Sequence, residues 1–172
     1  LKKEIFIDKG IAVYEQSHAI NNQFENFRYF ISEEKFNEML GFEIKPNDII
    51  MSCSGTMGKV AIIPEDAPKG IINQALLKLT PLENILPKYL KLLMESPSFQ
   101  QALNRTTMGV AIKNVASVKV LKELKIPLPS LKEQQKLIDE IEKIKNEIEN
   151  LNNEINNKEI SINDSIAKVW TE

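Results

Sequence analysis

The stretch SGTMGK at residues 54–59 holds two glycines three apart and then a lysine, residue types that can bind a phosphate group. A Walker-type loop needs a glycine, four residues and then Gly-Lys-Ser/Thr, so that the loop wraps the phosphates and the hydroxyl reaches magnesium. Here Cys53 stands five residues before Gly58, and Val60 follows Lys59. The next residues, VAIIP, are typical of a strand, whereas a phosphate loop opens a helix. The sequence therefore favours a glycine-containing hairpin turn over a nucleotide site.

Other catalytic arrangements are equally poorly supported. The chain has one histidine, His18, and one cysteine, Cys53, so it can form neither a disulfide nor a Cys/His zinc site. A nucleophile and base would have to be built from these two residues or a serine. His18 lies in YEQSHAINN, which lacks periodicity and favours a loop. We find neither an Asn-Pro-Pro-Tyr motif nor a glycine-rich cofactor loop, so we expect a protein that binds rather than reacts, with no catalytic residue, metal or cofactor.

Charge is unevenly distributed along the chain. The formal net charge is −2, but residues 67–129 carry 9 Lys and Arg against 3 Asp and Glu, which is a net charge of +6. The flanking segments 1–66 and 130–172 each have a net charge of −4. Such segregation can create a positive face that attracts a phosphate backbone. The basic segment is equally compatible with an ordinary solvated lysine surface.

Length and hydropathy favour one globular unit with an appendage. The chain has 172 residues, of which 42% are hydrophobic, enough for one core of ordinary size. No run approaches 18 apolar residues and no basic-then-apolar leader opens the chain, so we expect neither a membrane span nor a signal peptide. The single cysteine fits a reducing, cytoplasmic compartment. The first residue, Leu1, suggests that further residues precede it.

A long helix is expected over residues 130–172. Ser130 and Glu133 form a capping box after the segment Ile126-Pro-Leu-Pro129. About 40 residues make a rod of roughly 60 Å, and a unit of 130 residues is only about 30–35 Å across, so a partner helix is needed to cover its apolar stripe. The stripe alternates spacings of three and four and predicts a coiled-coil seam: Leu137, Ile141, Ile144, Ile148, Leu151, Ile155 and Ile162.

Residues 1–129 predict an α+β globular domain. We expect strands at 5–7, 11–14, 49–53, 59–63, 71–80 and 121–126, and helices at 33–40, from 87, and from 97. Ser32 is the expected N-cap of the first helix, and Pro87 and Pro97 open the other two. The predicted fold class is therefore α+β, followed by a long C-terminal helix that forms a coiled coil.

An ordered set of motifs resembles the target-recognition domain and following helix of type I restriction-modification specificity subunits. The motifs are Asn47-Asp48, Ser54-Gly55 with Gly58, Asn73-Gln74, Tyr89-Leu90, Gly109, and Ile126–Pro129 with Gln134. Each motif is weak alone, but the set is specific in its order from about residue 42 to the end. Residues 1–41 match more loosely, as expected of a variable part that meets bases.

The resemblance implies a protein without catalysis that recognises one half of a bipartite double-stranded DNA target. It also implies modification (methyltransferase) and restriction subunits as partners. The chain departs from the family in having one domain and one helix, and its domain is short at the N-terminus. It is either a half-subunit that dimerises through the seam or the C-terminal half of a longer chain. The alternative function is a coiled-coil scaffold whose globular head binds protein.

We expect DNA contacts in three places, because polar side chains read bases while lysine, arginine and backbone amides hold phosphates. Asn73 and Gln74 match a motif but favour a structural role inside an apolar strand. The expected contacts lie in the variable segment, at the hairpin and in the basic loop: Gln16, Ser17, His18, Asn21, Asn22, Ser54, Thr56, Lys59, Arg105, Thr106, Thr107, Lys113 and Asn114.

Overall fold

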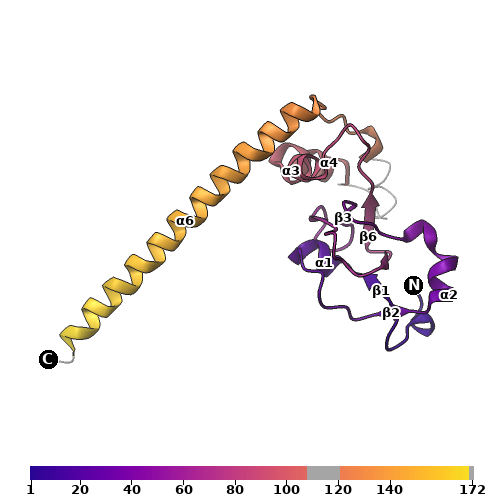
Figure 1. Cartoon of the computed structure of the whole chain (residues 1–172), viewed down its shortest axis with the longest axis horizontal. Coiled ribbons are helices and arrows are strands. Elements are labelled where there is room, and N and C mark those ends of the chain that lie inside the picture. Colours follow the sequence, from indigo (N-terminus) through magenta and orange to yellow (C-terminus); the bar gives the residue numbers. More distant parts are fainter. Residues whose placement is uncertain (108–120, 171–172) are drawn as a thin grey trace. The chain divides into compact units, whose positions relative to one another are not determined.

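The computed structural model describes residues 1–107 and 121–170 and divides the chain into two compact units (Figure 1). The first unit, Leu1–Leu131, holds all the strands of the described residues and the shorter helices. The second unit, Lys132–Glu172, contains one long helix except for its first residue. The expected fold class, an α+β part followed by a long helix, is confirmed.

Two small sheets make up the centre of the globular unit. In the first, β1 is antiparallel to β2 and parallel to β5, in the order β2-β1-β5. In the second, β3 is antiparallel to both of its neighbours, in the order β4-β3-β6. The strands are β1 (Ile11–Tyr14), β2 (Phe30–Ile31), β3 (Ile49–Ser52), β4 (Val60–Ile62), β5 (Gly70–Ile72) and β6 (Leu76–Leu79).

Side chains that alternate along the strands build a shared core and two outer ones. Tyr14 of β1 and Ile50 of β3 lie in one cluster, to which both sheets contribute. Val13, next to Tyr14 in β1, belongs to a second cluster. Ile49, next to Ile50 in β3, belongs to a third. This follows from the two-residue period of a strand, which turns successive side chains to opposite faces. The two sheets therefore share an inner core, and each has a second apolar face covered by helices.

Helices cover these outer faces. Phe36 of α2 (Glu33–Glu38) packs in the cluster of Val13 and Ile31, on the first sheet. Met94 of α3 (Pro87–Glu95) and Leu103 of α4 (Pro97–Thr107) pack in the cluster of the second sheet. Two short 3-10 helices, Lys3–Ile5 and Leu40–Phe42, and helix α1 (Gln16–Asn21) also belong to this unit.

Most expected elements are confirmed, and four expectations are wrong. The segment around His18, expected as a loop, forms helix α1. The Ser32 hydroxyl accepts a hydrogen bond from the Lys35 amide as the N-cap of α2. Residues 3–5 form a 3-10 helix, leaving only a single bridge at Ile7 to Phe30. Residues 121–126, expected as a strand, are helical at 121–123 and irregular afterwards. The expected strand at 71–80 is divided into β5 and β6, which lie in different sheets.

The break between β5 and β6 has a local cause. The Asn73 side-chain oxygen accepts a hydrogen bond from the amide of Ala75 at 2.9 Å, and the Asn73 amide donates to the carbonyl oxygen of Tyr14 at 2.9 Å. An asparagine that bonds the backbone two residues ahead turns the chain without needing glycine. Asn73 therefore acts structurally, as expected, by sending the chain from one sheet to the other.

Helix α6 (Leu131–Val169) is one continuous helix of 39 residues, drawn from orange to yellow in Figure 1. Its apolar stripe is exposed at most of the expected seam positions, with exposed fractions from 39% at Leu137 to 59% at Ile162. Ile141 is half-buried. A regular apolar stripe left open to water along a helix fits a coiled coil. Within the described residues, no helix is long and apolar enough to cross a membrane.

Candidate nucleic-acid interface

The loop between β3 and β4 is closed by a buried side chain at its base. The Ser52 hydroxyl is fully buried, donates to the carbonyl oxygen of Thr56 at 2.6 Å and accepts from the amide of Lys59 at 3.1 Å. The backbones of Ser52 and Lys59 also pair at 2.9 Å. Ser54, Thr56 and Lys59 are exposed above this closure. The hydroxyl side chains of this segment thus differ in role, since that of Ser52 shapes the loop and those of Ser54 and Thr56 face solvent.

The two glycines of this loop have the turn conformation that the sequence predicts. Gly55 has φ of 61° and Gly58 has φ of 84°, a region that side chains of L-residues rarely adopt. A Cβ on Gly55 would meet open space, whereas a Cβ on Gly58 would lie 2.7 Å from Oε1 of Gln100. Gly58 is therefore required both by its backbone conformation and by the close approach of helix α4.

Helix α1 presents the second group of expected residues. Ser17, Asn21 and Asn22 are exposed, and Asn22 ends the helix in the left-handed conformation, with φ of 52°. Gln16 is half-buried, and its side-chain oxygen has no hydrogen-bond partner among the described residues. Three of the expected contacts on this helix are thus available to a partner molecule.

His18 is buried, with 4% of its surface exposed, and both ring nitrogens are engaged. Nδ1 accepts from the amide of Glu15 at 2.9 Å, and Nε2 lies 3.1 Å from the carbonyl oxygen of Asn26. Because a carbonyl oxygen can only accept, Nε2 carries the proton in this arrangement. The ring also stacks on Phe27, with centroids 4.7 Å apart. His18 therefore holds the segment after α1 in place and presents no free nitrogen to a ligand.

Most of the basic loop lies outside the described residues. The backbones of Arg105, Thr106 and Thr107 belong to the last turn of α4, but their side chains are not described. Lys113 and Asn114 lie outside the described residues, as does Gly109 of the expected motif set.

Asp48 and Thr80, which the sequence analysis did not place at the site, hold the second sheet and the turn before β3 together. Asp48, 3% exposed, accepts from the amide of Lys45 at 2.8 Å and from the Thr80 hydroxyl at 2.6 Å. Both carboxylate oxygens are thus used inside the fold. The Asn47-Asp48 motif therefore fixes the turn that precedes β3, which is the strand that carries the exposed loop.

A groove brings the first two groups of expected residues together. Asn22, from the end of α1, and Lys59, from the loop, line the same hollow of about 420 Å³. Further residues of α1 and of the loop, Val60 of β4, and residues of α3 and α4 also line it. Ser54 and Thr56 do not line this groove, although they belong to the same loop. The arrangement offers an amide and an ammonium group inside the groove, with two hydroxyl groups on the adjoining loop.

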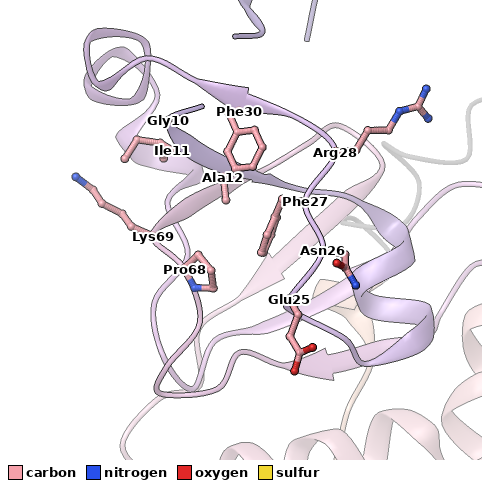
Figure 2. A pocket seen from close by; sticks show the side chains of 10 residues that line it. All are labelled: Gly10, Ile11, Ala12, Glu25, Asn26, Phe27, Arg28, Phe30, Pro68 and Lys69. Carbon is pink, nitrogen blue, oxygen red and sulfur yellow. The ribbon is translucent and has the colours of Figure 1, made fainter. Parts of the chain in front are cut away.

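A second hollow, of about 650 Å³, lies beside β1 and β2 (Figure 2). Figure 2 shows the rings of Phe27 and Phe30 in it and the side chain of Arg28 directed outward. The guanidinium of Arg28 lies 5.0 Å from the ring of Tyr29. The ammonium of Lys69 lies 2.7 Å from Glu33. This hollow contains none of the residues expected to contact DNA, whereas the groove contains Asn22 and Lys59, so it is the weaker candidate for a phosphate.

The chemistry available at these sites is recognition by hydrogen bonds and charge. Among the described residues, no group of three or more His, Cys, Asp or Glu side chains could hold a metal ion. Burial raises the pKa of the Cys53 thiol to about 11, an effect that a hydrogen bond with the backbone of Leu77 opposes. The thiol is therefore protonated at neutral pH and a poor nucleophile.

Comparisons with known proteins point to one family. A family model described as "Type I restriction modification DNA specificity domain" matches residues 1–158. The "Type I restriction enzyme EcoBI specificity subunit" of Escherichia coli is 31% identical over 97 residues, which are 56% of this chain and 20% of that subunit.

Solved structures have the same fold. A chain from a study of complex assembly and conformational transition of the type I R-M system aligns with a TM-score of 0.65 and 16% identity, over 88% of this chain and 35% of that one. The HsdS subunit from Thermoanaerobacter tengcongensis aligns with a TM-score of 0.62 and 15% identity, over 86% of this chain and 33% of that one. The chain thus spans about a third of these structures' length and a fifth of that of the curated relative.

Proposed function

The chain belongs to the type I restriction modification DNA specificity domain family, and we propose that its globular unit recognises one half of a bipartite target in double-stranded DNA. The observation that carries the proposal is the family match over residues 1–158, which includes the whole globular unit and most of helix α6. Exposed polar side chains on one loop and on the end of α1 support it.

The proposed contact residues divide by chemistry into those that suit bases and those that suit phosphates. The exposed hydroxyls of Ser54 and Thr56 and the amide of Asn22 can donate to and accept from base edges in a groove of DNA. Lys59 is an exposed cation at the end of the same loop and suits a phosphate. The buried Ser52 hydroxyl fixes the loop before DNA arrives, which lowers the entropy cost of binding.

The proposed role needs no catalytic group in this chain. Methyl transfer and cleavage belong to modification and restriction subunits, which we propose as its protein partners. Helix α6 pairs through its exposed stripe with a second helix, supplied by a second copy or by another part of the same protein, and the paired rod sets the distance between the two half-sites.

The test is a selection from a pool of random duplexes, using the natural protein that contains this chain, assembled with its modification subunit. We expect enrichment of a short motif with a fixed spacer. We also expect that log K against log salt has a negative slope, because lysine and arginine contacts release counterions. An assembled complex that enriches no motif would contradict the proposal.

A scaffold function, in which the globular unit binds protein, is supported by the exposed stripe of α6 alone. Variants of the loop between β3 and β4 distinguish the two functions. If Lys59→Ala and Ser54→Ala left duplex binding intact while weakening a protein complex, the scaffold function would be favoured. The DNA function predicts the opposite, because both side chains are exposed in the proposed contact loop.

A further inference from the structure

A second lysine lines the groove that contains Lys59. Lys91, on helix α3, has 26% of its side chain exposed, and its ammonium nitrogen lies 2.5 Å from Oε1 of Glu95, one turn later on the same helix. Glu95 lines the groove as well. The groove therefore holds two lysines from different elements and one carboxylate that neutralises one of them.

The pair of Lys91 and Glu95 has the less favourable polarity for stabilising its helix. Glu95 is the last residue of α3, where the helix dipole places partial negative charge. In pairs four residues apart, glutamate stabilises a helix better when it precedes lysine than when it follows. Neither rule accounts for a carboxylate at this position. Its effect is to hold the Lys91 ammonium in the groove.

Gln100 fixes the two lysine-bearing elements relative to each other. Its side-chain amide nitrogen donates to the carbonyl oxygen of Gly58 at 3.0 Å and to that of Met94 at 2.6 Å. Gly58 directly precedes Lys59 in the loop, and Met94 directly precedes Glu95 in α3. One amide group on α4 therefore connects both walls of the groove, so that the positions of the two cations are preorganised.

We propose that Lys91 is a second phosphate contact, which together with Lys59 binds the DNA backbone in this groove, and that Glu95 is a counter-ion that the phosphate displaces. The proposal rests on the proposed function of DNA recognition. A partly exposed ion pair is weak and screened by salt, so a phosphate can replace its carboxylate. Phosphate contacts set register and orientation, so Lys91 contributes affinity for every duplex and discriminates little between sequences.

The experiment measures the salt dependence of duplex binding by the natural protein assembled with its modification subunit. Lys91→Gln keeps a polar side chain with two of the four methylene groups and removes the charge, and Lys91→Ala removes nearly the whole side chain. We expect either change to make the slope of log K against log salt shallower by about 0.9, equally for target and non-target duplexes. Glu95→Gln should tighten binding to both duplexes, because the ammonium no longer has a competing anion.

Lys35→Ala is the matched control. Lys35 also forms an ion pair on its own helix, with Glu38, but it does not line the groove. We expect its slope to equal that of the parent protein. Unchanged thermal unfolding of the Lys91 variants would exclude a folding defect as the cause of weaker binding.

The outcomes distinguish this inference from the proposed function. If Lys59→Ala makes the slope shallower and Lys91→Gln does not, the inference about Lys91 is wrong and DNA recognition stands. If Lys91→Gln weakens assembly with the modification subunit and leaves the slope unchanged, the groove binds an acidic protein surface and the inference is again overturned. A parent complex without salt-dependent duplex binding would overturn both.

Discussion

The hydroxyl group of Ser52 donates a hydrogen bond to the carbonyl oxygen of Thr56 over 2.6 Å, so that a fully buried side chain at the end of β3 shapes the exposed loop beyond it. The amide of Lys59 donates to the same hydroxyl. Ser54, two residues after Ser52, is exposed. Two serines of one short segment thus have different functions, and mutagenesis can separate them.

Ser52→Ala should destabilise the globular unit by about 1–3 kcal/mol, because the carbonyl oxygen of Thr56 and the amide of Lys59 lose a partner on a fully buried side chain. Ser54→Ala should change the free energy of unfolding by less than about 0.5 kcal/mol, as is usual at exposed positions. The measurement is urea unfolding of both variants, followed by duplex binding. We expect Ser54→Ala to weaken binding without destabilising the protein. Equal unfolding midpoints for the two variants would contradict this division.

Gly58→Ala should be more destabilising than Gly55→Ala. Both glycines have positive φ, which costs alanine about 1–2 kcal/mol. Gly58→Ala adds a steric conflict, because its Cβ would lie 2.7 Å from Oε1 of Gln100, while Gly55 faces open space. Unfolding midpoints measure the difference. In a double-mutant cycle, adding Gln100→Ala should relieve part of the Gly58→Ala cost, and strict additivity would show that the two residues are not in contact.

The buried Cys53 thiol predicts loss of stability at alkaline pH. Because burial raises its pKa from 9.0 to about 11, the folded state keeps the proton that the unfolded chain releases. This contribution is complete below about pH 9 and declines as the pH rises towards 11, by about 3 kcal/mol in total. Urea unfolding from pH 8 to 11 measures the decline, which should be smaller for Cys53→Ala. Rapid alkylation of the native thiol at pH 8 would contradict its burial.

Ile148→Asp should weaken pairing of helix α6, because it places a charge in the middle of the apolar stripe, at a position that is 53% exposed in this chain. Asn153→Asp is the control, since it adds a charge on the opposite side of the heptad. Where the partner helix comes from a second copy, sedimentation measures the change. Where it comes from the same protein, thermal melting of the helix does. Identical behaviour of the two variants would exclude the proposed seam.

The sequence predicted those elements whose local signals agree with one another. The capped helix that begins after Ser32, the proline-opened helices α3 and α4, and the long helix α6 each combine periodicity with a start signal. Strands β3 and β4 were predicted because turn residues bracket short apolar runs. Tertiary pairing only had to extend what the local sequence already favoured.

The missed features depend on individual hydrogen bonds, some local and some between distant residues. Helix α1 has no apolar period, and its first turn is held by the Nδ1 of His18, which accepts from the amide of Glu15. Residues 71–80 read as one apolar run, and the break at Asn73 combines a local hydrogen bond from the Ala75 amide with a long-range one to Tyr14. Gln100 could not be assigned to the site, because its partner Gly58 is 42 residues away. Individual hydrogen bonds of this kind leave no periodic trace in a sequence.

The central claim is that the globular unit distinguishes one DNA sequence from others. The most direct measurement compares the affinity of the assembled natural protein for the duplex enriched by selection with its affinity for a shuffled duplex of equal length, over a salt series. Specific recognition predicts that the enriched duplex binds at least about 10³-fold more tightly at physiological salt. Equal affinities for the two duplexes at every salt concentration would contradict the claim.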